Sequence, residues 1–171
     1  MLKWVDFMLA KKKWLEDKEE LAKTLDTLKG QSLRKGAEQL EKQGKHIECA
    51  QAYLQIFNRN PNAEGNDQVL YNAGVCFEEG KSIGAAIAMF TTLSKRYPKS
   101  LTTKKAIARL GRNYARIAWY GRAAAKFEEF AKRFAGEKGA PEVLGEAVLY
   151  RKGLGSDDKA MAMSLSESGI V

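Results

Sequence analysis

Residues 67–103 read DQVLYNAGVCFEEGKSIGAAIAMFTTLSKRYPKSLTT, and their apolar pattern recurs 37 residues earlier and 37 residues later. Six sets of equivalent positions show the period: Leu33/Leu70/Ile107, Ala37/Gly74/Gly111, Leu40/Phe77/Tyr114, Cys49/Ala86/Ala123, Tyr53/Phe90/Phe127 and Ile56/Leu93/Phe130. Pro61 and Pro98 follow, with Ala135 where a third proline would fall. Internal periods of this length are typical of stacked supersecondary units.

The spacing inside each copy predicts two amphipathic helices. In the first copy, for example, Cys49, Tyr53 and Ile56 lie four and three residues apart, as on one face of a helix. A single pair of such helices cannot bury its apolar face alone, so neighbouring copies are expected to stack. The sequence therefore predicts an all-α fold.

Glycines mark two kinds of position in this pattern. Gly44 and Gly80 fall between predicted helices, where a C-cap needs positive φ. Gly74 and Gly111 fall inside helices, where glycine costs about 1 kcal/mol relative to alanine. We therefore expect close helix packing at the latter two, with the aromatic residue of the fifth set beside each of them.

These motifs resemble the tetratricopeptide repeat over roughly residues 30 to 150. The middle copy carries nearly the whole pattern: Leu70, Ala73, Gly74, Phe77, Ala86, Phe90 and Pro98. Two features depart from the family: the period exceeds the usual length of about 34 residues, and Leu or Ile replaces the leading Trp. The resemblance implies an α-solenoid of helix-turn-helix repeats that forms a right-handed superhelix, with a concave groove in which partner peptides bind.

The period divides the chain into five parts. We expect an N-terminal capping helix in 1–29, repeats in 30–66, 67–103 and 104–140, and a partial repeat or capping helix with a flexible tail in 141–171. The first part carries a heptad-like stripe, which leaves self-association through a coiled coil as an alternative. The stripe consists of Trp4, Phe7, Lys11, Trp14, Lys18, Leu21, Leu25 and Leu28.

The formal charge of +8 is concentrated in the third repeat, where residues 104–140 hold ten Lys or Arg and three acids. Lys105, Arg109, Arg112 and Arg116 fall at i, i+4, i+7 and i+11, which places four cations on one stripe of a helix. By resemblance to the family, this stripe faces the groove. It predicts binding of an acidic partner segment.

A sharper hypothesis comes from the family's carboxylate clamp, which holds a partner's C-terminal carboxylate. The resemblance carries this clamp onto Arg34, Glu38, Asn72, Lys105 and Arg109. Glu38 departs from it, since an asparagine is expected there and an acid repels the ligand.

Against both hypotheses, neighbouring acids could neutralise the stripe. Glu142 and Glu146 lie one period after Lys105 and Arg109, and Glu78 and Glu79 precede the stripe in the second repeat. The sequence leaves the ligand-binding and self-neutralised readings open.

No catalytic motif is present, and we expect no enzyme activity, cofactor or metal. His46 has no partner fixed by spacing, and Cys49 and Cys76 are expected to be buried thiols, with a disulfide or a metal site as the alternatives. The basic stripe also leaves nucleic-acid binding as an alternative function.

The location of the protein stays open in the sequence. Without an export signal we expect a soluble, cytoplasmic protein, with no segment inserted in a membrane. The repeats are similar in character to those of bacterial envelope proteins, such as the Tol-Pal coordination protein and the lipoprotein of the outer-membrane assembly machine. A segment of a larger exported protein would instead lie in the bacterial periplasm or envelope, in an envelope, motility or secretion assembly.

Overall fold

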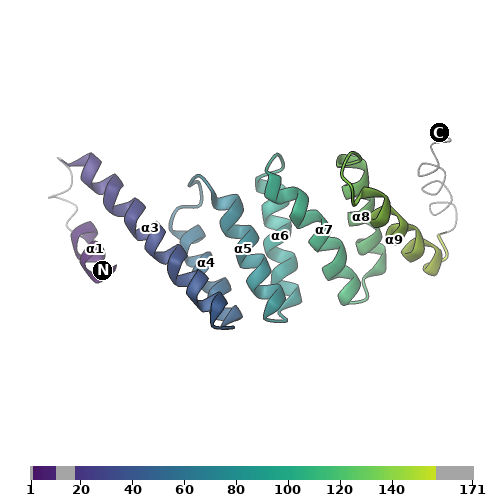
Figure 1. Cartoon of the computed structure of the whole chain (residues 1–171), viewed down its shortest axis with the longest axis horizontal. Helices are drawn as coiled ribbons and strands as arrows, with labels where there is room; N and C mark the ends of the chain where they lie inside the picture. Colours follow the sequence, from purple (N-terminus) through teal and green to yellow (C-terminus); the bar gives the residue numbers. More distant parts are fainter. Residues whose placement is uncertain (1, 11–17, 157–171) are drawn as a thin grey trace.

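The computed structural model describes residues 2–10 and 18–156, which form helices joined by short turns, with no strand among them (Figure 1). The helices are α1 (Leu2–Ala10), α3 (Glu19–Lys42), α4 (His46–Arg59), α5 (Asn66–Glu79), α6 (Ile83–Arg96), α7 (Leu101–Arg116), α8 (Tyr120–Arg133) and α9 (Ala140–Gly153). The predicted all-α fold is confirmed.

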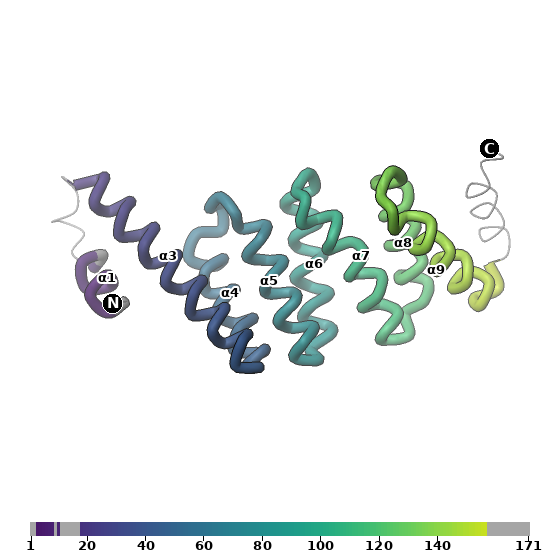
Figure 2. Tube along the Cα trace, in the orientation of Figure 1, coloured from purple at the N-terminus to yellow at the C-terminus, as the bar shows by residue number. Residues whose placement is uncertain are grey.

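The helices from α3 onward stack in one row, and each packs against the next in the chain (Figure 2). In this view α3, α5, α7 and α9 lie in front, while α4, α6 and α8 lie behind them. The arrangement is an α-solenoid of helix-turn-helix units, as expected. The right-handed sense of its superhelix stays a prediction.

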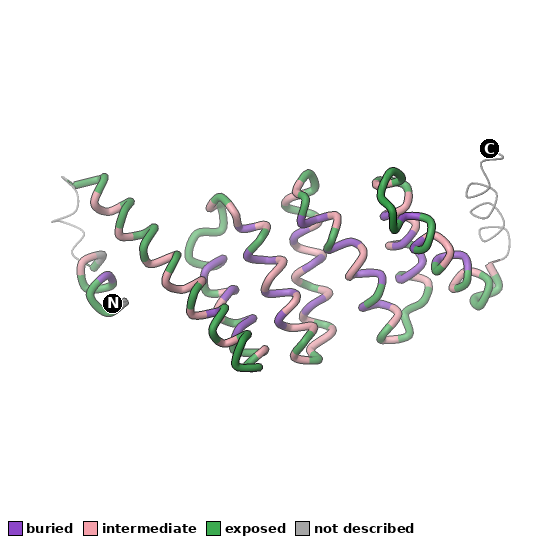
Figure 3. Tube along the Cα trace, in the orientation of Figure 1, coloured by how far each residue is buried: buried purple, intermediate pink, exposed green. Residues whose placement is uncertain are grey.

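The buried residues form one continuous core along the row (Figure 3). Two of its contacts repeat with the period: the Phe90 ring packs on Gly74, and the Phe127 ring packs on Gly111. A Cβ added to Gly74 would lie 2.5 Å from a ring carbon of Phe90, and one added to Gly111 would overlap Phe127 still more. The expected close packing at these glycines is confirmed.

The turns between paired helices also repeat. Gly44, Lys81 and Ala118 have φ values of 71°, 60° and 59°, and Gly155 continues the series with 68°. These four positions are spaced by 37 residues. Each turn is closed by the six-residue hydrogen bond of a Schellman cap. The bonds run from Lys45 N to Leu40 O (2.9 Å), Ser82 N to Phe77 O (2.8 Å), Trp119 N to Tyr114 O (2.9 Å) and Ser156 N to Arg151 O (2.9 Å).

Gly80 does not have the positive φ that we expected; its φ is −73°. The left-handed residue of this turn is Lys81, which is the residue equivalent to Gly44. A Cβ at position 80 would lie 2.6 Å from Ile47 Cδ1, the end of a flexible side chain, and 3.2 Å from Cys76 O.

After each of two helical hairpins, a buried polar side chain makes a hydrogen bond to a backbone carbonyl of the connecting loop. Asn66 Nδ2 donates to Asn60 O (2.7 Å), and Thr103 Oγ1 donates to Tyr97 O (2.6 Å). Both side chains are almost fully buried, at 1% and 0% exposure. The two pairs are 37 residues apart, so equivalent positions make the same contact, once through an amide and once through a hydroxyl.

A second set of equivalent positions links neighbouring repeats, and its chemistry changes along the chain. Ser100 Oγ donates to Asp67 Oδ2 (2.5 Å). One period later, Lys104 Nζ pairs with Glu137 Oε1 (2.6 Å). One period earlier the same two positions hold Gly30 and Ala63, which have no polar side chain. The first junction therefore lacks this link.

At the N-terminal end, α1 packs against α3, with Val5 buried and Asp6 paired with Lys29. Helix α3 runs without interruption across residues 29 and 30, and the division of the chain into five parts stays a prediction. Two members of the heptad-like stripe, Lys11 and Trp14, lie outside the described residues, as does the expected tail beyond Ser156. Among the described helices, none has the length and apolar character to cross a membrane.

Candidate partner-binding surface

The predicted basic stripe lies along α7. Lys105, Arg112 and Arg116 are exposed, and Arg109 is half-buried. The helix begins at an N-cap serine, Ser100, whose Oγ accepts from Thr102 N (3.1 Å). Its buried face packs into the core and fixes its rotation. The buried residues are Thr102, Thr103, Ala106, Ile107, Leu110, Gly111, Asn113 and Tyr114.

The carboxylate of Glu78, on α5, receives three donors from α7. Arg109 Nη1 lies 2.9 Å and Asn113 Nδ2 3.2 Å from its Oε2, and Arg116 Nη1 lies 3.3 Å from its Oε1. The Glu78 side chain is only 11% exposed, so its charge-assisted contact with Arg109 is largely shielded from water, while the Arg116 side chain is 49% exposed. Here α7 already holds a carboxylate, supplied by the neighbouring repeat.

Tyr71 completes this arrangement. Arg109 Nε donates to the Tyr71 hydroxyl (3.1 Å), and the guanidinium also lies over the Tyr71 ring, 5.7 Å from its centroid. Burial lowers the pKa of Arg109, but the hydrogen bonds to Glu78 and Tyr71 outweigh burial and leave the pKa raised. Arg109 is therefore a fixed, permanently charged group.

The other two cations are disposed differently. Lys105 and Arg112 make no ion pair with any described residue. Of the four acids considered as neutralising partners, Glu78 is the one that pairs with the stripe. Within the described ranges, the remaining three, Glu79, Glu142 and Glu146, make no ion pair. Two of the four cations, Arg109 and Arg116, thus share one carboxylate, which offsets a single positive charge of the stripe.

Of the clamp residues outside α7, Arg34 and Glu38 lie on α3 and Asn72 lies on α5. Arg34, on α3, lines a cleft between α3, α4 and the start of α5. Glu38 instead lines a shallow groove along α3. Asn72, on α5, accepts from Gln68 Nε2 (2.7 Å). No hydrogen bond joins any two members of the hypothetical clamp in the described part of the chain, so the clamp stays a prediction.

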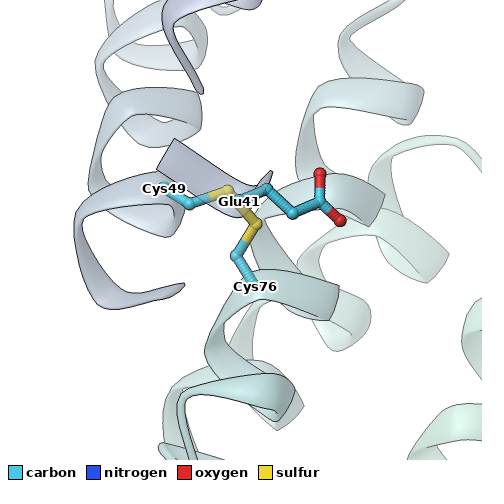
Figure 4. A group of neighbouring side chains, drawn as sticks. All are labelled: Glu41, Cys49 and Cys76. Atoms are coloured by element: carbon cyan, nitrogen blue, oxygen red, sulfur yellow. A yellow bond between two sulfur atoms is a disulfide. The ribbon is translucent and has the colours of Figure 1, made fainter. Parts of the chain in front are cut away.

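The two cysteines form a disulfide between α4 and α5 (Figure 4). The expectation of two free buried thiols is wrong, because the stacking of α5 on α4 brings Cys49 and Cys76 to a Cα–Cα distance of 6.0 Å. Their sulfurs and a Glu41 carboxylate oxygen lie within 4.8 Å of one another. Disulfide sulfurs are not thiolate ligands, so this group could hold a metal only after reduction.

Groups suited to catalysis are not assembled in the described part of the chain. His46 begins α4, and its buried Nδ1 has no hydrogen-bond partner there. No nucleophile or carboxylate is hydrogen-bonded to this imidazole among the described residues.

Two members of the Glu78 network were not foreseen from the sequence. Tyr71 and Asn113 carry no pattern that marks them as polar partners, since each is unique within its set of equivalent positions. Position 113 is equivalent to Cys76, so a core position of the repeat holds a buried amide here. The proximity of Glu78 to the stripe was the one available signal.

The fold and its site define a class: a helical-repeat solenoid with a polar network between successive first helices. The model of a tetratricopeptide repeat family matches residues 68–100, which lie in the middle copy of the repeat. Residues 68–100 are therefore a repeat of the tetratricopeptide type, in a chain whose fold is a helical-repeat solenoid. No curated protein matches its sequence.

Solved structures with the same fold cover most of the chain. The structure of BtubC (BKLC) from P. vanneervenii has a TM-score of 0.62 at 14% identity, over 98% of this chain and 78% of that one. A MamA RS-1 double mutant has a TM-score of 0.61 at 17% identity, over 81% and 74%. A putative kinesin light chain of Podospora anserina with TPR-like repeats has a TM-score of 0.59 at 9% identity, over 99% and 92%. These likenesses concern the fold.

Proposed function

We propose that this chain is a non-enzymatic scaffold that binds an acidic segment of a partner protein across the first helices of its repeats. The observation that carries the proposal is the state of the α7 stripe. Lys105 and Arg112 are exposed cations without an ion pair in the described ranges, beside a site at which Arg109 and Arg116 already bind a carboxylate. Electrostatic complementarity of this kind supports association with acidic partners.

The test uses a fluorescein-labelled eight-residue peptide of glutamates, with binding followed by fluorescence anisotropy. Lys105→Glu with Arg112→Glu is expected to weaken binding roughly tenfold, because each change replaces an attraction with a repulsion. Lys132→Glu with Lys138→Glu is the matched control, since it changes the net charge equally at exposed positions outside the stripe. Equal weakening by both variants would show that only net charge matters.

The carboxylate-clamp version of the proposal needs a further comparison. Arg34, Asn72, Lys105 and Arg109 would bind a free C-terminal carboxylate, and Glu38 opposes it. The same peptide with an amidated C-terminus should then bind more weakly than the free acid. Equal affinities would leave the acidic segment as the ligand and remove the clamp.

The alternative functions have tests of their own. Nucleic-acid binding is less favoured, because Tyr53, Phe90 and Phe127 are at most 2% exposed and cannot stack on bases. A single-stranded oligonucleotide that competes with the peptide, with an affinity falling steeply as salt rises, would favour nucleic-acid binding.

Self-association through α1 or the solenoid ends would appear as a concentration-dependent mass in light scattering. A role in a bacterial envelope, motility or secretion assembly rests on the character of the repeats alone.

A further inference from the structure

A cleft of about 270 Å³ opens at the first repeat junction, where the polar link between neighbouring repeats is missing. Gly30 and Ala63, which occupy the places of Asp67 and Ser100, both line it. Its apolar wall also includes Leu33 and Ile56. Small side chains at the two linking positions thus leave space that the next two junctions fill with a hydrogen bond and an ion pair.

Asn66 gives this cleft an unused hydrogen-bond acceptor. Its Nδ2 donates to Asn60 O, as Thr103 donates to Tyr97 O one period later. The threonine has no further polar atom, whereas the amide has Oδ1, which has no hydrogen-bond partner among the described residues. Asn66 is 1% exposed and lines the cleft. A buried acceptor of this kind is satisfied by a ligand that brings a donor.

The charges around the cleft cancel. Arg59 pairs with Asp26 (2.5 Å), while Arg34 and Glu64 line the cleft without an ion pair to any described residue. Two cations thus face two anions, which favours an uncharged ligand, because a charged group would be desolvated without a net counter-charge. The volume lies below the roughly 300–1,000 Å³ of small-molecule sites, which suits one side chain.

We infer that this cleft receives one tyrosine side chain of a partner, whose O–H donates to Asn66 Oδ1. Tyrosine combines an apolar body with one donor, which matches the aliphatic wall and the single acceptor. The inference deepens the proposed scaffold function and adds a second contact point, on α3 and α4, apart from the stripe on α7.

The probes are N-acetyl-tyrosinamide and N-acetyl-phenylalaninamide, which differ by the hydroxyl. Titration followed by ¹⁵N–¹H correlation spectra should show a Kd on the order of 1 mM for the tyrosine probe, with shifts at Leu33, Ile56 and Asn66. The phenylalanine probe should bind roughly 2- to 12-fold more weakly, since it lacks one hydrogen bond. Shifts elsewhere, or equal affinities, would overturn the inference.

Two variants separate ligand recognition from structure. Asn66→Thr keeps a donor for Asn60 O, as in Thr103, but replaces the separate amide acceptor with the same hydroxyl oxygen that makes this bond, so the preference for the tyrosine probe should shrink. Gly30→Asp with Ala63→Ser transplants the Asp67–Ser100 link and should abolish binding of both. Undiminished discrimination in Asn66→Thr contradicts the inference. If that variant does not fold, the Gly30/Ala63 pair still decides, since unchanged binding there would place the probe elsewhere.

The stripe variant distinguishes this inference from the proposed function. Lys105→Glu with Arg112→Glu lies on α7 and should leave tyrosine binding unchanged. Failure of the acidic peptide to bind would remove the stripe as a site and leave the cleft standing. Failure of the tyrosine probe would remove the cleft and leave the stripe.

Discussion

The ring of Phe127 lies against Gly111 so closely that three of its carbons would fall within 2.8 Å of a Cβ at that position. The ring is 1% exposed, so it has no free space into which to move. Gly74 and Phe90 repeat the arrangement one period earlier. Glycine thus allows the two helices to pack closely at this position, although it lowers the helix propensity.

Gly111→Ala is therefore expected to lower the free energy of unfolding by about 1–2 kcal/mol. Overpacking costs about 1–3 kcal/mol, and the gain in helix propensity of up to about 1 kcal/mol offsets part of it. Chemical denaturation measures the change. Combining it with Phe127→Leu should cost less than the sum of the two single changes, because they share one contact.

Gly36→Ala is the matched control for that prediction. Gly36 lies inside α3, and a Cβ there would meet nothing within 4 Å. The substitution should raise the free energy of unfolding by up to about 1 kcal/mol. A loss of stability in Gly36→Ala as large as that in Gly111→Ala would contradict the packing explanation.

Ala118→Gly should stabilise the chain. Ala118 has a φ of 59°, a conformation that costs residues other than glycine about 1–2 kcal/mol. Glycine loses more chain entropy on folding, about 0.4–1 kcal/mol, so the expected net gain is about 0.5–1 kcal/mol. Thermal melting would detect it. Ala115→Gly, three residues earlier in α7, should instead destabilise by about 1 kcal/mol.

Asp67 should make stability depend on pH in the acid range. The hydrogen bond from Ser100 lowers the pKa of Asp67 below 3.8, and burial opposes this only in part. A carboxyl whose pKa is depressed in the folded state stabilises the protein above its unfolded pKa, and this contribution is lost as pH falls through the folded pKa. Asp67→Asn should thus be less stable than the original chain at pH 7, and the difference should shrink below about pH 4. A pH-independent difference would show that the carboxylate charge is irrelevant.

Reduction of the Cys49–Cys76 disulfide should destabilise the folded chain. The bond closes a loop with a sequence separation of 27 residues, for which chain entropy predicts a loss of about 2–4 kcal/mol. Denaturation with and without dithiothreitol measures it. Cys49→Ala with Cys76→Ala should give the same result in both buffers, and a reductant effect on this variant would point to another cause.

The repeating part of the fold could be predicted because residues one period apart make equivalent contacts in each repeat. The packing of Phe90 on Gly74 follows from one glycine and one aromatic residue that recur together. Gly80 shows the limit of such reasoning: glycine suggested positive φ, but the period assigns that conformation to Lys81. The position in the repeat was a better guide there than the residue type.

The candidate site could be predicted less well. Helical spacing placed the four cations of α7 on one stripe, but their partners come from another helix. Which of four acids reaches them depends on how α5 and α7 stack, and the disulfide depends likewise on α4 and α5. Such contacts join residues about one period apart and leave no local pattern in the sequence.

The disulfide also limits how far the chain could be stretched by its ends. It spans α4 and α5, at the same junction that lacks the polar link between repeats. While the bond is intact, the segment it encloses cannot be extended, and the fully stretched chain is shorter by about 90 Å. Under tension, the hairpins nearer the C-terminus would yield their full length, while α4 and α5 would stay tethered even after they had unravelled.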